Sequence, residues 1–182
     1  MSGATGAPIT IALLTALRRL NVETHLILTK WAESTLRHET DYTPSQLRAL
    51  ADVVHLNHDL ASPLSSGSFT VHGMIIAPCS VKTLAAVASG YHDGLVARAA
   101  DVALKQRRPL VLAVRETPLS GIHIANMATV TQHGAIVFPP VPAFYSRPAT
   151  IQDIVDHTVG RMLDLFGLDT QAFDRWHGFP KE

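Results

Sequence analysis

The chain has 182 residues, enough for one domain with a sizeable core, and its 47% hydrophobic and 16% charged residues are typical of a globular protein. Its 15 basic and 15 acidic residues cancel, which argues against a broad nucleic-acid-binding surface, and no apolar run reaches the roughly 18 residues of a membrane span. One cysteine excludes an internal disulfide and fits a reducing cytoplasm. The low charge indicates a surface partly buried in a homo-oligomer.

Apolar runs alternate with helical patterns along the chain. Strands are predicted at 22–29, 53–56, 73–78, 109–114 and 135–138, and helices at 9–20, 31–37, 44–50, 81–89, 95–107, 122–132 and 151–165. This alternation predicts an α/β fold: a three-layer, Rossmann-like (flavodoxin-like) parallel sheet with helices on both faces. We expect residues 1–182 to form a single domain, with a C-terminal tail from about residue 167.

A stretch of small residues, Ser2 to Pro8, comes directly before the first helical pattern. A glycine-rich turn that opens a helix presents free N–H groups and the positive end of the helix dipole, which favours an anion and most often a phosphate. The alternative is a plain turn without a ligand. Such a turn normally follows a buried strand, so about five apolar residues are expected before Ser2.

Other polar residues follow predicted strands, where parallel sheets bind their ligands. Ser80 opens a helix after a buried strand, either as a second anion site or as an ordinary N-cap. Cys79 beside it is interpreted as a small buried hydrophobe rather than a nucleophile. Arg115-Glu116 ends another apolar strand with two charges that need partners or a ligand. The histidines form no metal-binding motif, so we predict no metal site.

Five motifs, in order, resemble those of the UbiX/Pad flavin prenyltransferases, and specifically the phenolic (phenylacrylic) acid decarboxylase branch of that family. They are Ser2-Gly3-Ala4-Thr5-Gly6-Ala7, Pro78-Cys79-Ser80-x-x-Thr83, Arg98-Ala99-Ala100-Asp101-Val102-Ala103-Leu104-Lys105, Arg115-Glu116-x-Pro118 and Pro142-Ala143-Phe144-Tyr145. The resemblance extends from Ser2 to about Trp176. This sequence departs from the family pattern at Thr29, where serine is usual, and at Leu60-Ala61, where some members carry tryptophan.

The resemblance implies a cytoplasmic flavoprotein domain that binds FMN and needs no metal. Its members transfer a dimethylallyl group from dimethylallyl phosphate to N5 and C6 of reduced FMN. The prenylated FMN then serves a UbiD-type decarboxylase, and family members form dodecamers. Neither a nucleic acid nor a membrane is expected as a partner.

The resemblance also implies roles for individual residues. Catalytic roles fall to Glu39, Glu116, Lys105, Arg98 and Trp176, the last two completing the site across the boundary between subunits. FMN would be contacted by Gly3, Ala4, Thr5, Thr29, Ser80, Val81, Lys82, Thr83 and Arg115. The dimethylallyl phosphate group would be bound by Tyr145, Arg161 and Lys105. Two alternatives remain: direct FMN-assisted decarboxylation of an aromatic acid, and a non-catalytic flavin carrier that would not need Lys105, Glu39 or Arg161.

Overall fold

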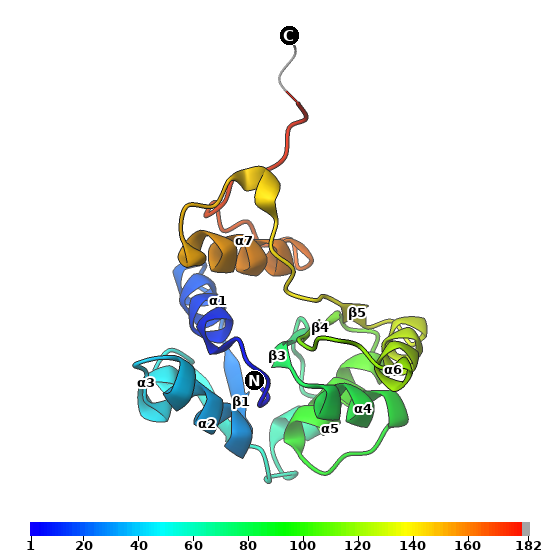
Figure 1. The fold of residues 1–182 in the computed structure, drawn as a ribbon. Helices are drawn as coiled ribbons and strands as arrows, with labels where there is room; N and C mark the ends of the chain where they lie inside the picture. Colours follow the sequence, from blue (N-terminus) through cyan, green and yellow to red (C-terminus); the bar gives the residue numbers. More distant parts are fainter. Residues whose placement is uncertain (180–182) are drawn as a thin grey trace.

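The computed structural model describes residues 1–179, and Figure 1 shows its arrangement. Helices and strands alternate along most of the chain, as predicted. In chain order the elements are α1 (Ala7–Arg19), β1 (His25–Leu28), α2 (Lys30–Glu39), α3 (Pro44–Arg48), β2 (Val53–Leu56), η1 (Pro63–Ser65), β3 (Met74–Cys79), α4 (Val81–Ser89), α5 (Leu95–Lys105), β4 (Leu110–Val114), α6 (Gly121–Gln132), β5 (Ile136–Val137), η2 (Phe144–Ser146) and α7 (Ile151–Asp164).

The strands pair in parallel within two sheets, β1-β2 and β3-β4-β5. The first two residues of the chain lie between these sheets and bond to both (Figure 1). The amino group of Met1 donates to the Ile27 carbonyl at 2.9 Å, and the Ser2 N–H donates to the Pro78 carbonyl at 3.2 Å. Counting this segment, the order β2-β1-(Met1–Ser2)-β3-β4-β5 matches the Rossmann arrangement. The prediction of an α/β parallel-sheet fold is confirmed.

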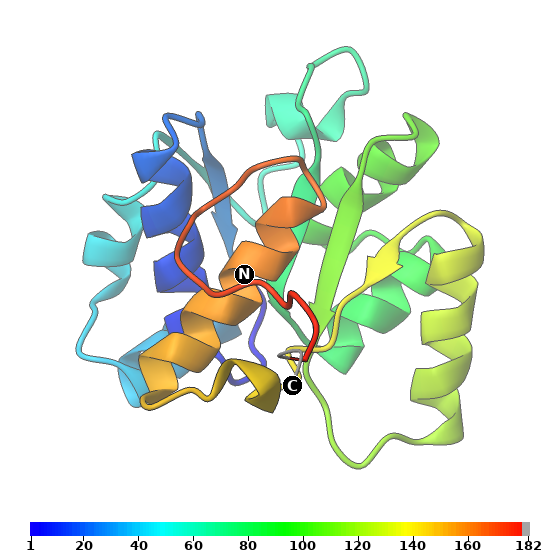
Figure 2. The ribbon, with the colours of Figure 1, turned by 90° about the horizontal axis from the view of Figure 1, so that it is seen from above.

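Helices cover both faces of the strands, which gives the three predicted layers (Figures 1 and 2). The composition of β4 explains this covering of both faces, because all five of its residues are apolar and buried. Val111 and Ala113 pack in a cluster with residues of α1 and α7, whereas Leu110 and Leu112 pack with residues of α4, α5 and α6. An uninterrupted apolar strand is expected when both faces are covered. A further cluster packs α1, α2 and α3 around β1.

Element boundaries differ from the predictions by a few residues. The strand predicted from 22 begins at His25, because the Thr24 N–H and hydroxyl both donate to the Asp52 carboxylate instead of joining a ladder. The first helix begins at Ala7, two residues before the apolar run that starts at Ile9, and Pro8 lies in its first turn. The predicted tail is described as far as Phe179, and its last positions, 180–182, lie outside the described residues. No helix within 1–179 is both long and apolar enough to cross a bilayer.

Candidate functional site

The carboxyl ends of β1 and β3 meet at the start of the chain. The Ser2 hydroxyl donates to the Pro78 carbonyl at 2.9 Å and accepts the Ser80 N–H at 2.8 Å, so the small-residue turn is joined directly to the end of β3. Thr29 and Ser80 are the N-caps of α2 and α4, as their side chains accept the N–H groups of Ala32 and Thr83. The N-cap interpretation of Ser80 is therefore confirmed. Each helix aims its N-terminus at the same edge of the sheet.

The N-terminus of α1 is bound by an anion from within the chain. Glu39, the last residue of α2, accepts the N–H groups of Gly6 and Ala7 through the same oxygen, Oε2, at 2.8 Å each. Gly6 has a φ of 119°, a backbone conformation that favours glycine, and it precedes Ala7, the first helical residue. The sequence left open whether this turn is an anion site or a plain turn, and in the structure a carboxylate of the chain itself accepts two of its N–H groups.

The charge of Glu39 is stabilised by its surroundings. Burial raises the pKa of this carboxyl, but hydrogen bonds from the Thr5 side chain and from the Gly6 and Ala7 N–H groups, together with the charge of Arg115, bring the pKa below its usual value. The influence of Arg115 also indicates that the end of β4 lies near the end of α2. Glu39 is thus an anion at neutral pH, within the influence of an exposed guanidinium.

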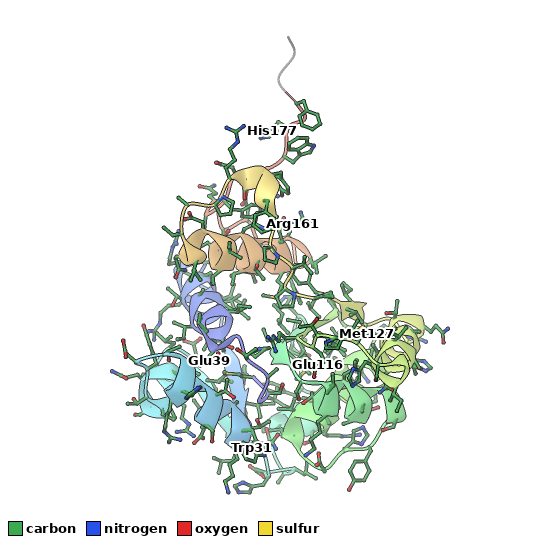
Figure 3. The ribbon with its side chains drawn as sticks, viewed as in Figure 1. Trp31, Glu39, Glu116, Met127, Arg161 and His177 are labelled. Carbon is green, nitrogen blue, oxygen red and sulfur yellow. The ribbon has the colours of Figure 1, made fainter. Side chains whose placement is uncertain are left out.

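Arg115 and Glu116 follow directly after β4 at this same edge, and Figure 3 labels Glu116 and Glu39 on its two sides. The Arg115 N–H donates to the Cys79 carbonyl at 3.0 Å, which fixes the main chain, while the Arg115 side chain is exposed. A Glu116 carboxylate oxygen accepts only the neighbouring Thr117 N–H, at 3.0 Å, among the described residues. Its second oxygen is therefore available to a ligand. We name the residues Ser2–Thr5, Thr29, Glu39, Ser80–Thr83 and Arg115–Glu116 the strand-end cluster.

Two residues of the strand-end cluster, Lys82 and Gly3, contribute through their main chain rather than through a side chain. The Lys82 ammonium is exposed and pairs with Asp93 at 3.2 Å, so α4 offers a ligand its N-terminal N–H groups more than this side chain. Gly3 lies against α2 so tightly that a Cβ there would be 2.4 Å from the Trp31 Cβ. Trp31 itself is 71% exposed, and it was not among the residues selected from the sequence. The signal available in the sequence was the position of Trp31, two residues after the end of the predicted strand at 22–29.

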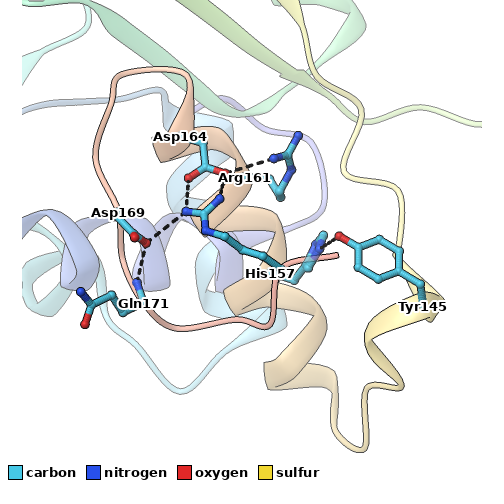
Figure 4. Close-up of polar contacts among 7 residues, drawn as sticks. Tyr145, His157, Arg161, Asp164, Asp169 and Gln171 are labelled. Carbon is cyan, nitrogen blue, oxygen red and sulfur yellow. Dashed lines mark hydrogen bonds and ion pairs between the residues drawn. The ribbon is translucent and has the colours of Figure 1, made fainter. Parts of the chain in front are cut away.

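A second group lies on α7 and the segments that pack against it (Figure 4). The Tyr145 hydroxyl and His157 Nε2 are 2.8 Å apart. The Trp176 ring meets the Tyr145 ring edge-on at a centroid distance of 5.6 Å. Burial and the charge of Arg161 lower the pKa of His157, so the imidazole is neutral at neutral pH. Arg161 is held by Asp164 at 3.1 Å and remains exposed.

Arg98 and Lys105 form a third group on α5. Arg98 donates to the Ser65 carbonyl at 3.2 Å and to Asp101 at 2.9 Å, whereas Lys105, the last residue of the helix, is exposed. Within residues 1–179, no hydrogen bond or ion pair links this group, the α7 group and the strand-end cluster. The predicted flavin contacts therefore share one edge of the sheet with Glu39 and Glu116, whereas no hydrogen bond or ion pair among residues 1–179 joins them directly to Tyr145, Arg161 or Lys105.

Cys79 is fully buried beside the strand-end cluster, and burial raises the pKa of its thiol to about 12. A protonated, inaccessible thiol is a poor nucleophile. The interpretation as a buried hydrophobe is confirmed. No group of three or more His, Cys, Asp or Glu residues in the described part of the chain is arranged to hold a metal ion.

Comparison with known proteins identifies the family. The Flavoprotein family model matches residues 1–163. A probable UbiX-like flavin prenyltransferase of Escherichia coli O157:H7 is 54% identical over 182 residues, which is 100% of this chain and 92% of that protein. The chain belongs to the UbiX-like flavin prenyltransferase branch of the Flavoprotein family. The resemblance found from five motifs is thereby confirmed over the whole chain.

Solved structures of this UbiX-like branch match the fold closely. The crystal structure of AnUbiX (PadA1) in complex with FMN and dimethylallyl pyrophosphate superposes with a TM-score of 0.98 at 62% identity, covering 99% of this chain and 96% of that one. The dodecameric FMN-dependent UbiX-like decarboxylase from Escherichia coli O157:H7 gives 0.95 at 52% identity, covering 98% and 100%. One of these similar proteins was crystallised with FMN, and the other is FMN-dependent.

Proposed function

We propose that this protein is a flavin prenyltransferase that transfers a dimethylallyl group from dimethylallyl phosphate to reduced FMN. The observation that carries the proposal is the strand-end cluster, in a chain that is 62% identical to a protein crystallised with FMN and a dimethylallyl donor. The cluster combines two helix N-termini, an exposed guanidinium and two carboxylates at one edge of a parallel sheet. That is the edge at which such sheets bind their ligands.

The donor chemistry of the strand-end cluster suits FMN. Thr29 accepts an N–H in its capping role, so its hydroxyl hydrogen can still be donated to a ligand. Ser80 also accepts an N–H, and its hydroxyl pairs with that of Thr83 at 3.1 Å, so one hydroxyl hydrogen of this pair can be donated to a ligand. The N-termini of α2 and α4 favour a phosphate, whereas that of α1 already binds Glu39. We therefore assign FMN to Gly3, Ala4, Thr5, Thr29, Ser80, Val81, Lys82, Thr83 and Arg115. Reduced FMN, when bound, supplies the electron-rich partner that the dimethylallyl group alkylates.

Residues of this chain would then bind the leaving phosphate and transfer the protons. Allyl–phosphate cleavage leaves a negative charge on the departing group, which fixed cations stabilise without reorganisation. Tyr145, Arg161 and Lys105 would bind this phosphate. Glu116 has a carboxylate oxygen free of described partners at the cluster and would take or deliver a proton. Glu39 would hold the turn at Gly6 and keep a negative charge opposite Arg115.

The separation of the three groups supports a site assembled from several subunits. Arg98 and Lys105 lie on α5, and Tyr145, Arg161 and Trp176 lie on or beside α7, without a bond to the strand-end cluster. A similar protein is dodecameric. Large apolar side chains are exposed at Ile122 and Phe144, which are both 73% accessible, so an apolar surface is available for contacts between subunits. We therefore propose a homo-oligomer, with a dodecamer as the expected form.

Three further assignments belong to the same proposal. Residues 1–182 would form one FMN-binding domain. The product would be passed to a UbiD-type aromatic acid decarboxylase. The buried free thiol of Cys79 is consistent with a cytoplasmic location, where thiols stay reduced.

Substitution of Glu116 by Gln tests the catalytic part of the proposal. The amide keeps the shape of the side chain but cannot carry a proton, so prenyl transfer should fall by about 10²–10⁴-fold while FMN stays bound. The assay incubates reduced FMN and dimethylallyl phosphate anaerobically with each variant and follows prenylated flavin by mass. Glu23→Gln is the matched control, because Glu23 precedes β1 at the opposite ends of the strands.

Each outcome of this assay discriminates between mechanisms. A Glu116→Gln protein that binds FMN and forms product at the parental rate would remove Glu116 from the chemistry. Loss of FMN from the variant would instead mean that Glu116 serves cofactor binding. A parental protein that binds FMN, makes no prenylated flavin and releases CO2 from an aromatic acid would support the decarboxylase alternative; one that does neither would support the flavin carrier.

A further inference from the structure

A buried imidazole lies behind Tyr145, one of the residues proposed to bind the donor phosphate. His157 is in the middle of α7 and is only 9% exposed, whereas Tyr145 is 47% exposed. The Tyr145 hydroxyl and His157 Nε2 are 2.8 Å apart (Figure 4). Among residues 1–179, neither side chain makes another hydrogen bond. Within the described part of the chain, His157 therefore has a polar connection to the proposed donor site only through the Tyr145 hydroxyl.

The imidazole of His157 is held between two aromatic rings. The Tyr145 ring and the Phe173 ring make T-shaped contacts with it, at centroid distances of 5.5 Å and 4.9 Å. Phe173 is itself fixed, because it packs on Gly160 so closely that a Cβ there would be 2.2 Å from the Phe173 ring. The Arg175 guanidinium lies 5.0 Å from the centroid of the same ring. This packing keeps Nε2 directed at the Tyr145 hydroxyl.

The direction of the hydrogen bond between His157 and Tyr145 decides what Tyr145 can offer a ligand. A neutral imidazole carries one proton, on Nδ1 or on Nε2, and a tyrosine hydroxyl can donate one hydrogen bond while it accepts another. With the proton on Nδ1, Tyr145 donates to Nε2 and offers a ligand only an acceptor. With the proton on Nε2, His157 donates to the Tyr145 oxygen, and the hydroxyl hydrogen is available to a ligand. A phosphate dianion offers only acceptors, so the second arrangement suits it.

We propose that His157 is a positioning residue for the dimethylallyl phosphate donor: its Nε2–H donates to the Tyr145 oxygen and so directs the Tyr145 hydroxyl hydrogen toward the donor phosphate. The inference rests on the proposed function, from which it takes the role of Tyr145. Arg161 lies one turn further along α7, on the same side of the helix, and its side chain is exposed. α7 thus carries both a cation for the phosphate and the residue that orients a neutral donor.

The test compares two amides of different reach at position 157. The amide nitrogen of His157→Gln takes about the place of Nε2 and can still donate to Tyr145, whereas His157→Asn is too short to reach it. Prenyl transfer to reduced FMN is measured anaerobically while dimethylallyl phosphate is varied. His157→Asn should raise KM by about 5–10-fold and change kcat by less than about twofold, because the lost hydrogen bond serves binding. His157→Gln should keep KM within about threefold of the parental value.

A double-mutant cycle shows whether His157 acts through the Tyr145 hydroxyl. Tyr145→Phe should raise KM by about 10–100-fold, as the loss of a hydrogen bond to a charged group does, and His157→Asn should add nothing in that background. Thr158→Val is the matched control, because Thr158 is also buried on α7 but its hydroxyl donates to the Ile154 carbonyl within the helix, at 2.7 Å. This control should leave KM unchanged. Equal KM values for His157→Gln and His157→Asn would overturn the proposal, as would a full additional effect of His157→Asn in Tyr145→Phe.

A spectroscopic measurement decides the matter if His157→Asn does not fold. Nitrogen NMR of the FMN-bound parental protein with labelled histidine reports which imidazole nitrogen carries the proton, and His157→Gln identifies the His157 signals by their loss. We expect the proton on Nε2, and a proton on Nδ1 alone would overturn the proposal. A parental protein that makes no prenylated flavin would instead refute the proposed function. The Kd of inorganic phosphate for the FMN-bound proteins then replaces KM, with the same ratios expected between variants.

Discussion

Glu39 makes a quantitative prediction because one carboxylate oxygen serves two main-chain donors. Its bonds to the Gly6 and Ala7 N–H groups, at 2.8 Å each, are charge-assisted. Hydrogen bonds to charged groups contribute about 1.5–3 kcal/mol each, and a carboxylate at a helix N-terminus adds about 0.3–1 kcal/mol. Glu39 is only partly buried, so water can replace part of the stabilisation that these hydrogen bonds provide. We expect Glu39→Ala to reduce the free energy of unfolding by about 2–3 kcal/mol and Glu39→Gln by about 1–2 kcal/mol.

The assay is urea unfolding of parental protein, both Glu39 variants and Glu33→Gln. Glu33 lies on the same helix but pairs with Arg37 and Arg48 at the surface, so its substitution should cost less than about 1 kcal/mol. The pKa of Glu39 is lowered in the folded state, so its stabilisation is present above its usual pKa and disappears as pH falls through the folded value. The Glu39→Gln difference should shrink in acid. Equal stability of Glu39→Gln and Glu33→Gln at neutral pH would refute the reasoning.

Three further predictions follow from burial and exposed surface. The lowered pKa of the Met1 amine means that the unfolded chain binds the extra proton, so the free energy of unfolding should rise by about 2 kcal/mol from pH 6 to pH 8, and an N-acetylated chain measured by the same urea titration should lack this slope. Cys79 should resist alkylation in the native protein and react after unfolding, as followed by mass; rapid native labelling would contradict its burial. Light scattering should find a homo-oligomer at micromolar concentration, and an active monomer would contradict a site shared between subunits.

The fold could be predicted from the sequence because its signals are local. β4 is a continuous apolar run that ends in charge, and α4 begins at a serine that caps it, so both elements follow from short-range chemistry. The first helix is similar, since the small residues before Pro8 mark its start. The boundaries of the helices and strands were harder to predict, because hydrogen bonds between distant residues shift them. At the start of β1, for example, the Thr24 N–H donates to the Asp52 carboxylate.

The site was only partly predictable for a different reason. Strand ends converge by topology, so Thr29, Ser80 and Arg115 could be grouped from the order of the elements alone. The residue that occupies the first helix N-terminus could not be found this way, because Glu39 reaches Gly6 from the far end of another helix. Trp31 was missed because its contact with Gly3 appears only when two segments pack. Lys105 lies at the end of α5, and no hydrogen bond or ion pair among the described residues joins it to the strand-end cluster, so the order of the elements did not relate the two.

The most direct test of the central claim is turnover by the unmodified protein. Protein, reduced FMN and dimethylallyl phosphate are incubated anaerobically, with dimethylallyl pyrophosphate in a parallel reaction, and the extracted flavin is weighed by mass spectrometry. We expect a flavin heavier by one dimethylallyl group in at least the monophosphate reaction, and none without protein. Recovery of FMN at its original mass from both reactions, with the cofactor bound throughout, would contradict the claim.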